Sequence, residues 1–339
     1  MTNFTPQVKR VGKSDKDQLK FAFGLAREQR FDEALEEFET IIQNNPGSKF
    51  AHLGAGNVFF RQELYEDALR HFQIAIRIDP LMTQAYIGAG QAHLRQRKLK
   101  QALEKFQAAL NIDPNCTEGL QGIGQVLAKQ EDYDRAIEQW RKAQRLNPQL
   151  ISVRLLMSQV YHKQGKLAEA LSELKSALNI DPTRWRTQYG VGRIYLEQKD
   201  YIRAIEAFET ALKLNPDTPP IAQLGLVEAL IKVNQLDEAA EILRQMPRTK
   251  TIQARMHELW GDLYQRQGLL KEATEEYRAA ALIASEEGST PDELAELDAL
   301  FGEDRWQDAV APYKAVANKQ VSEARARQRE NFQKSRFAR

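Results

Sequence analysis

The sequence is short of the residues on which several classes of protein depend. Its 339 residues include one cysteine, Cys116, which excludes a disulfide framework and a zinc site built from cysteines. The longest unbroken aliphatic run, Ala279 to Ala284, is far shorter than the roughly 20 residues that a membrane-spanning helix needs. The first residues also lack the apolar core of a secretory signal. We therefore expect a cytoplasmic protein.

The sequence also carries almost no net charge. The 48 Lys and Arg residues are balanced by 47 Asp and Glu residues, so the net charge of +1 excludes binding to nucleic acid or membrane by bulk charge alone. The balance hides a polarity along the chain, because residues 1–20 carry +3 and residues 319–339 carry +5. The sequence therefore predicts an acidic body with two basic ends.

What the sequence does contain is an internal period of 34 residues. An alanine recurs at this interval and continues after a one-residue insertion, at Ala34, Ala68, Ala102, Ala136, Ala170, Ala204, Ala239 and Ala273. A bulky residue follows each alanine by four positions, at Phe38, Phe72, Phe106, Trp140, Leu174, Phe208, Leu243 and Tyr277. A proline follows the first six alanines by 12 positions, at Pro46, Pro80, Pro114, Pro148, Pro182 and Pro216. A small residue precedes most of the alanines by 12 positions, at Ala22, Gly56, Gly90, Gly124, Ser158, Gly192 and Gly261.

This pattern resembles the tetratricopeptide repeat (TPR), a helix–turn–helix unit of 34 residues with the same kinds of residue at these spacings. The resemblance covers about residues 15–287, as eight units. It implies an all-α fold in which the units stack into a right-handed superhelical solenoid, since one unit cannot bury its apolar face alone. The seventh unit carries the insertion and lacks the closing proline, which leaves its register open by one residue.

The two ends of the chain depart from the pattern. Residues 1–14 are polar and basic, and we interpret them as a disordered arm. Residues 288–318 contain a second-helix pattern around Ala309, which predicts a degenerate ninth unit that caps the solenoid, with Pro312 in the first turn of its helix. Residues 319–339 form a basic tail that extends as a helix. This tail is either a solvated end or a contact surface for an acidic partner, RNA or an anionic membrane surface.

No motif for a cofactor, a metal or catalysis is found. Glycine pairs such as Gly88-Ala89-Gly90 imitate a dinucleotide fingerprint, but they recur at the repeat period and lack a preceding strand. The five histidines show no metal-ligand spacing, and Cys116 has no histidine nearby in sequence. We therefore expect a protein that is not an enzyme and that has no cofactor, no metal and no small-molecule substrate.

In the TPR family, the first helix of each unit lines a groove where partner proteins bind, and three rows of residues fall on this helix. Eleven positions before the alanines lies an amide row with a basic end, at Asn57, Gln91, Gln125, Gln159 and Arg193. Seven positions before lies a basic row, at Arg27, Arg61, Arg95, Lys129 and Lys163. Fourteen positions before lies a glycine row, at Gly54, Gly88, Gly122, Gly190 and Gly225.

Each row has two interpretations. The basic row is either a generic solvated face or a surface for a partner with Asp or Glu residues. The glycines, which weaken a helix interior, are required either by close helix packing or by close approach of a partner backbone. The amide row turns acidic at Glu228 and Asp262, which favours a partner that presents basic residues to that end. Of the asparagines in the carboxylate clamp of chaperone-binding TPR domains, only Asn57 has a counterpart.

Together, these features predict a non-catalytic scaffold or adaptor that binds segments of other proteins in a TPR groove, as an assembly factor for a larger complex. The alternative is a factor associated with nucleic acid or the ribosome through its basic ends.

Overall fold

The computed structural model describes residues 15–216, 220–285, 292–300 and 306–335, and these residues form helices without a strand. The predicted all-α fold is therefore confirmed. The disordered arm expected for residues 1–14 lies outside the described residues. No described helix is both long enough and apolar enough to cross a membrane.

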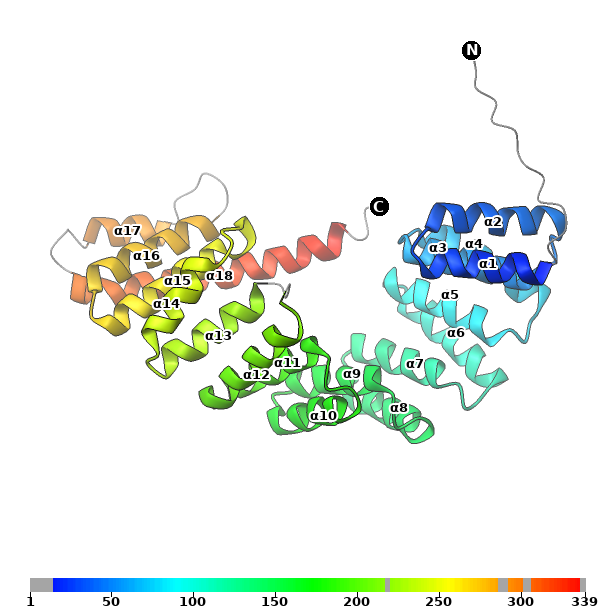
Figure 1. Cartoon of the computed structure of the whole chain (residues 1–339), viewed down its shortest axis with the longest axis horizontal. Coiled ribbons are helices and arrows are strands. Elements are labelled where there is room, and N and C mark those ends of the chain that lie inside the picture. Colours follow the sequence, from blue (N-terminus) through cyan, green and yellow to red (C-terminus); the bar gives the residue numbers. More distant parts are fainter. Residues whose placement is uncertain (1–14, 217–219, 286–291, 301–305, 336–339) are drawn as a thin grey trace, which may run out of the picture. The chain divides into compact units, whose positions relative to one another are not determined.

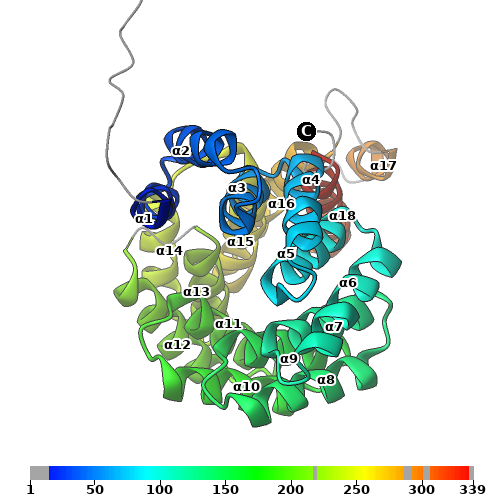
Figure 2. The same ribbon diagram turned by 90° about the vertical axis from the view of Figure 1, so that its right-hand side faces the viewer.

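The described residues divide into two compact units, with the boundary after Val153. The first unit contains four helical hairpins, α1 (Asp15–Arg27) with α2 (Phe31–Asn44), α3 (Lys49–Arg61) with α4 (Tyr65–Ile78), α5 (Thr83–Arg95) with α6 (Leu99–Ile112), and α7 (Thr117–Lys129) with α8 (Tyr133–Leu146). Helices α1, α3, α5 and α7 contact one another in turn. Of these, α5 and α7 lie on one side of the unit and their partners α6 and α8 on the other (Figure 2). The first helices thus form a continuous face.

The second unit begins within α9 (Ile151–Lys163) and continues the alternation of first and second helices. Its further helices are α10 (Leu167–Ile180), α11 (Trp185–Glu197), α12 (Tyr201–Leu214), α13 (Ile221–Lys232), α14 (Leu236–Gln245), α15 (Lys250–Gln267), α16 (Leu270–Ala284), α17 (Asp292–Leu300) and α18 (Trp306–Ser335), as labelled in Figure 1. Each second helix up to α14 packs against the first helix that follows it, as in the first unit.

The periodic alanines lie in the core of the molecule. All eight are fully buried, and five of the bulky residues that follow them are aromatic rings with no exposed surface: Phe38, Phe72, Phe106, Phe208 and Tyr277. Burial of Ala239 and Leu243 in α14 also assigns the register of the seventh unit, in agreement with the insertion before it. Because alanine adds little bulk, the two helices of a hairpin approach closely and the ring fills the space beyond.

The glycines make room for these rings. A Cβ atom added to Gly56 would lie 2.7 Å from the ring of Phe72, and one added to Gly88 in the next repeat would lie 2.6 Å from the same ring. Gly90 and Gly122 border Phe106 in the same way. Contacts under 3 Å cannot be accommodated without a shift of the buried ring. Phe72 and Phe106 are therefore each inserted between two glycines, one from the same repeat and one from the next.

Two kinds of turn separate the helices. At the end of a repeat, an Asp or Asn before the proline accepts a hydrogen bond from the backbone N–H two residues later, as Asp79 does from Leu81 at 3.0 Å and Asp113 from Asn115 at 3.0 Å. Within a repeat, the residue five positions before the alanine has a positive φ, a conformation that suits glycine best, as at Gly165 and Gly268. The other positions are Gln29, Glu63, Arg97, Glu131, Lys199 and Asn234.

The C-terminal end departs from the regular arrangement. Helix α18 packs directly against α16, a place taken elsewhere by the first helix of the next repeat, and α17 packs against α18. Ala309 and Tyr313 are buried together with Ala273 and Tyr277. Pro312 lies in the second turn of α18 and not in the first, so the expectation for this residue was wrong. Since α18 runs unbroken past Lys319, the predicted boundary between cap and tail is not a boundary of secondary structure.

Candidate functional site

Two cavities open on the face formed by the first helices of the first unit. The larger, of about 490 Å³, lies between α3, α5 and α7 and is lined by Leu53, Asn57, Phe60, Phe72, Thr83, Gln84, Ile87, Gly88, Gln91, Asp113, Cys116 and Glu118. The smaller, of about 410 Å³, lies between α1 and α3 and is lined by Phe23, Ala26, Arg27, Gly54, Asn57, Val58, Phe60 and Arg61. We call them the apolar cavity and the arginine cavity. Both volumes lie in the range of about 300–1,000 Å³ that is usual for ligand sites.

The arginine cavity brings together residues of all three predicted rows. Arg27 and Arg61 come from the basic row, Asn57 from the amide row and Gly54 from the glycine row. The Arg61 guanidinium donates a hydrogen bond from Nη1 to the carbonyl oxygen of Ala26 at 2.9 Å, which fixes its position at the end of α1. Among the described residues that line this cavity there is no Asp or Glu. The cavity therefore offers two cations to an anionic group.

The apolar cavity has the opposite character. Its wall is formed by Leu53, Phe60 and Ile87, and its rim carries the amides of Asn57 and Gln91. Phe60 packs edge-on against Tyr65, with ring centroids 5.7 Å apart. No Lys or Arg is among the described residues that line it. Asn57 and Phe60 line both cavities, so these two residues form the wall between them.

Most other residues of the amide and basic rows are accessible. Gln159, Arg193, Arg95, Lys129 and Lys163 are exposed, and Gln125 is half-buried. Arg193 lies near Glu197, whose carboxylate also contacts the ring of His162 at 2.8 Å. The cation of Arg193 therefore has a carboxylate beside it.

The glycine row is explained by packing. Added Cβ atoms at Gly54, Gly88, Gly122 and Gly225 would lie 2.3–2.6 Å from phenylalanine rings of the preceding repeat, and one at Gly190 would lie 3.3 Å from Leu174. Of the two interpretations of this row, the structure supports helix packing. The space that a side chain at these positions would need is filled by other side chains of the protein, so the glycines are explained without a partner.

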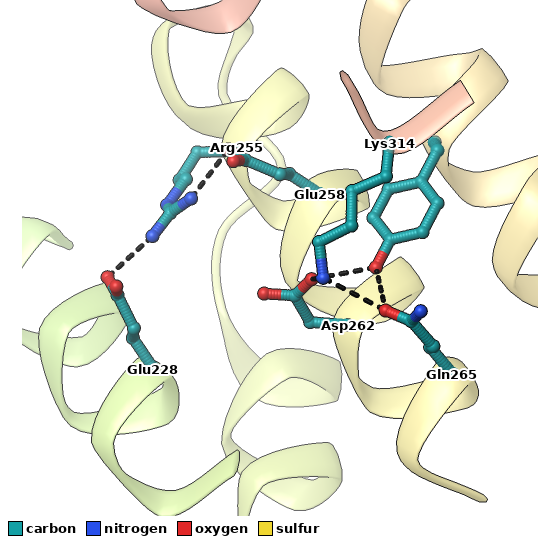
Figure 3. A network of polar contacts seen from close by, with 7 residues as sticks. Glu228, Arg255, Glu258, Asp262, Gln265 and Lys314 are labelled. Atoms are coloured by element: carbon teal, nitrogen blue, oxygen red, sulfur yellow. Dashed lines mark hydrogen bonds and ion pairs between the residues drawn. The ribbon is translucent and has the colours of Figure 1, made fainter. Parts of the chain in front are cut away.

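The acidic end of the amide row is neutralised within the chain (Figure 3). Glu228 pairs with Arg255 at 2.5 Å, and Arg255 pairs in addition with Glu258 at 2.6 Å. Burial of Arg255 acts to lower its pKa, but the two carboxylates outweigh this effect and raise it, so the guanidinium stays charged. The expectation that this end presents free acidic residues to a basic partner was wrong.

A second part of the same network involves the C-terminal helix. Lys314 of α18 approaches Asp262 at 2.7 Å and Gln265 at 2.9 Å, and its ammonium lies 5.4 Å from the centre of the Tyr277 ring. The Tyr277 hydroxyl donates to Asp262 at 2.7 Å, and burial together with this carboxylate raises the pKa of Tyr277. Helix α18 therefore supplies the cation that Asp262 requires.

The basic tail is partly engaged as well. Lys319 pairs with Glu293, and Arg327 donates to the carbonyl oxygen of Ala284 at 2.8 Å at the end of α16. These contacts give two of the tail's cations a role in holding α18 in place. No group of three or more His, Cys, Asp or Glu side chains that could hold a metal is found among the described residues.

Sequence reasoning missed two features of the first unit. Phe60 was not singled out, although it lies eight positions before Ala68 on the face of the predicted groove. The interval of 19 residues that joins first and second helices was also missed. At this interval His52 and His71 meet, with 3.1 Å between their Nδ1 atoms, and Trp140 donates from Nε1 to the carbonyl oxygen of Gln121.

The fold and the accessible face of first helices define a helical-repeat protein of the kind that binds other proteins. Tetratricopeptide repeat models match residues 24–81, 53–115, 124–165, 151–184 and 195–263, and the chain belongs to the tetratricopeptide repeat family. No curated protein matches the sequence significantly.

Solved structures with the same fold are similar at low sequence identity. The Cut9–Hcn1 hetero-tetramer of the APC/C matches 94% of this chain and 57% of its own, with a TM-score of 0.56 and 18% identity. PilF of Pseudomonas aeruginosa matches 65% of this chain and 97% of its own, with a TM-score of 0.51 and 23% identity. The C-terminal part of a TPR repeat-containing protein from Cytophaga hutchinsonii matches 76% and 98%, with a TM-score of 0.50 and 15% identity. These similarities show the fold.

Proposed function

We propose that this protein is a scaffold that binds an extended, acidic segment of a partner protein along the first helices of its first unit. The observation that carries the proposal is the arginine cavity, where Arg27 and Arg61 line an open space and no Asp or Glu is among the described lining residues. Arg95 and Lys129 continue the basic row on α5 and α7. A negatively charged strand that follows this row gains a favourable interaction with each repeat in turn.

The amide row supports an extended segment in particular. Side-chain amides both donate to and accept from a peptide backbone, so Asn57 and Gln91 can bond a strand whatever its side chains are. The role of such a scaffold is the assembly of a larger complex, in which the bound segment belongs to another subunit. The basic tail receives no comparable support, because Lys319 and Arg327 are held by the chain itself.

The test starts from a random dodecapeptide display library selected on the whole protein, followed by fluorescence anisotropy with the enriched peptides. A groove variant carries Arg27→Glu, Arg61→Glu and Arg95→Glu. The control variant carries Arg77→Glu, Lys100→Glu and Arg145→Glu, which changes the net charge equally but at exposed positions of the second helices α4, α6 and α8.

Enriched peptides should be acidic, and the groove variant should bind them at least about ten-fold more weakly, mainly through slower association and with a weaker salt dependence. The control should bind within about two-fold of the unmodified protein. Circular dichroism checks that both variants stay folded. Peptides without acidic residues, or an equal loss in the control, would show that the proposal is wrong.

A further inference from the structure

The two cavities of the first unit differ in chemistry, and they adjoin each other through Asn57 and Phe60. One is lined by two arginines and no carboxylate, and the other has an apolar wall without a cation. A ligand that carried only acidic residues would fill the first and leave the second empty. A ligand that fills both cavities must therefore carry a second kind of group besides its negative charge.

The apolar cavity is suited to a hydrophobic side chain. Leu53, Phe60 and Ile87 supply its wall, and Phe60 and Ile87 are half-buried, so each keeps apolar surface that an incoming side chain can cover. Its two carboxylates already have partners in the chain. Asp113 accepts from the backbone N–H of Asn115 at 3.0 Å, and Glu118 accepts from the Thr117 hydroxyl at 3.0 Å. Both donors are neutral, so the two carboxylates keep their charge, and the apolar side chain that we expect contacts Leu53, Phe60 and Ile87.

The spacing between the two subsites follows from helix packing. Neighbouring helices lie roughly 8–10 Å apart, and an extended peptide rises about 3.3 Å per residue. A strand that crosses from α3 to α5 therefore advances by about three residues. The amides of Asn57 and Gln91, one on each of these helices, lie along the same path and can bond the backbone between the two side chains.

We infer that the recognised segment carries a large aliphatic or aromatic residue about three positions from an Asp or Glu, with the apolar side chain in the cavity beside Ile87 and the carboxylate at Arg27 and Arg61. This inference rests on the proposed function and adds to it a hydrophobic anchor. Burial of the anchor supplies affinity that resists salt, whereas the carboxylate sets the association rate.

The test compares selections from the random dodecapeptide library on three forms of the full chain. The first is the unmodified protein. The second is Ile87→Gln, which replaces apolar wall by a neutral polar side chain of similar length. The third is Leu155→Gln, a matched control at the same repeat position in α9, half-buried and in the lining of neither cavity.

The unmodified protein and the control should enrich peptides with an apolar residue about three positions from an acidic one. Ile87→Gln should retain the acidic residue and lose the apolar preference. In anisotropy measurements, exchange of the anchor for Gln in an enriched peptide should weaken binding about ten-fold to the unmodified protein and less than about two-fold to Ile87→Gln. Raising the salt concentration should leave this difference in place.

Acidic peptides without an apolar preference, an apolar preference that persists in Ile87→Gln, or enrichment of lysine at the anchor position would each overturn the inference and leave the proposed function intact. Enrichment of no acidic peptides would overturn both.

Discussion

The two units differ in whether charged residues on their first helices are paired within the chain. In the first unit, Arg27 and Arg61 line an open cavity with no carboxylate beside them. In the second unit, Glu228 and Asp262, at the same repeat position as Asn57, are paired with Arg255 and Lys314. The cations that pair with them come from two places, because Arg255 lies on the first helix α15 and Lys314 on the C-terminal helix α18.

Positions of the glycine row differ in how closely a neighbouring side chain approaches them, which leads to the largest expected effect. Gly122→Leu in the first unit should lower the free energy of unfolding by about 3 kcal/mol, because a Cβ at this position already meets the buried ring of Phe106 at 2.5 Å. In the second unit, Gly190→Ala should change stability by less than about 1 kcal/mol, because alanine favours the helix while its Cβ, 3.3 Å from Leu174, requires that flexible side chain to shift slightly. Urea denaturation of both variants measures the difference. Equal losses would show that the row does not serve to admit rings.

The next prediction concerns the ion pair between Lys314 and Asp262 in the second unit. Lys314→Met removes the cation from Asp262 and should cost about 2 kcal/mol, because a largely buried carboxylate loses its charged partner. The double variant Lys314→Met/Asp262→Asn should recover part of this loss. A double-mutant cycle measured by chemical denaturation gives the coupling between the two residues. Additive losses would mean that the ion pair between Lys314 and Asp262 does not contribute to stability.

The smallest expected effect is a change of stability with pH, which depends on two histidines of the first unit. His52 and His71 share a hydrogen bond, and burial lowers the pKa of both, so the folded protein holds them neutral. The groups that act on them are Asp67, which raises the pKa of His71, Arg70, which lowers it, and the Pro46 carbonyl, which raises that of His52.

Because the unfolded chain takes up protons below a pH of about 6.5 and the folded pair does so less readily, stability should fall by up to about 1 kcal/mol from pH 7.5 to pH 5.5. Thermal melts across this range measure the loss, which should shrink in His52→Gln/His71→Gln. His257→Gln is the matched control, since His257 meets Glu276 at the same interval of 19 residues at 2.6 Å. An unchanged pH profile in the double variant would exclude the pair as its source.

The sequence was sufficient to predict the architecture because each repeat contributes the same local contacts. Alanine at the helix crossing and an aromatic residue four positions later recur so regularly that the hairpins and their order follow from spacing alone. Spacing also identified Arg27, Asn57 and Arg61 as neighbours on one face, since residues 34 apart, or four apart on one helix, lie close in a stack of repeats.

Tertiary structure alone decided which of these residues is available to a partner. Nothing near Asp262 in sequence indicates that Lys314 neutralises it, because the contact depends on how α18 packs against α15 and α16. In the same way, the glycines could be assigned to ring packing only once Phe72 and Phe106 were placed between them. A repeat pattern determines which side chains share a face, because that depends on local helix geometry. Long-range packing determines whether that face is open, because the residues that cover it come from elsewhere in the chain.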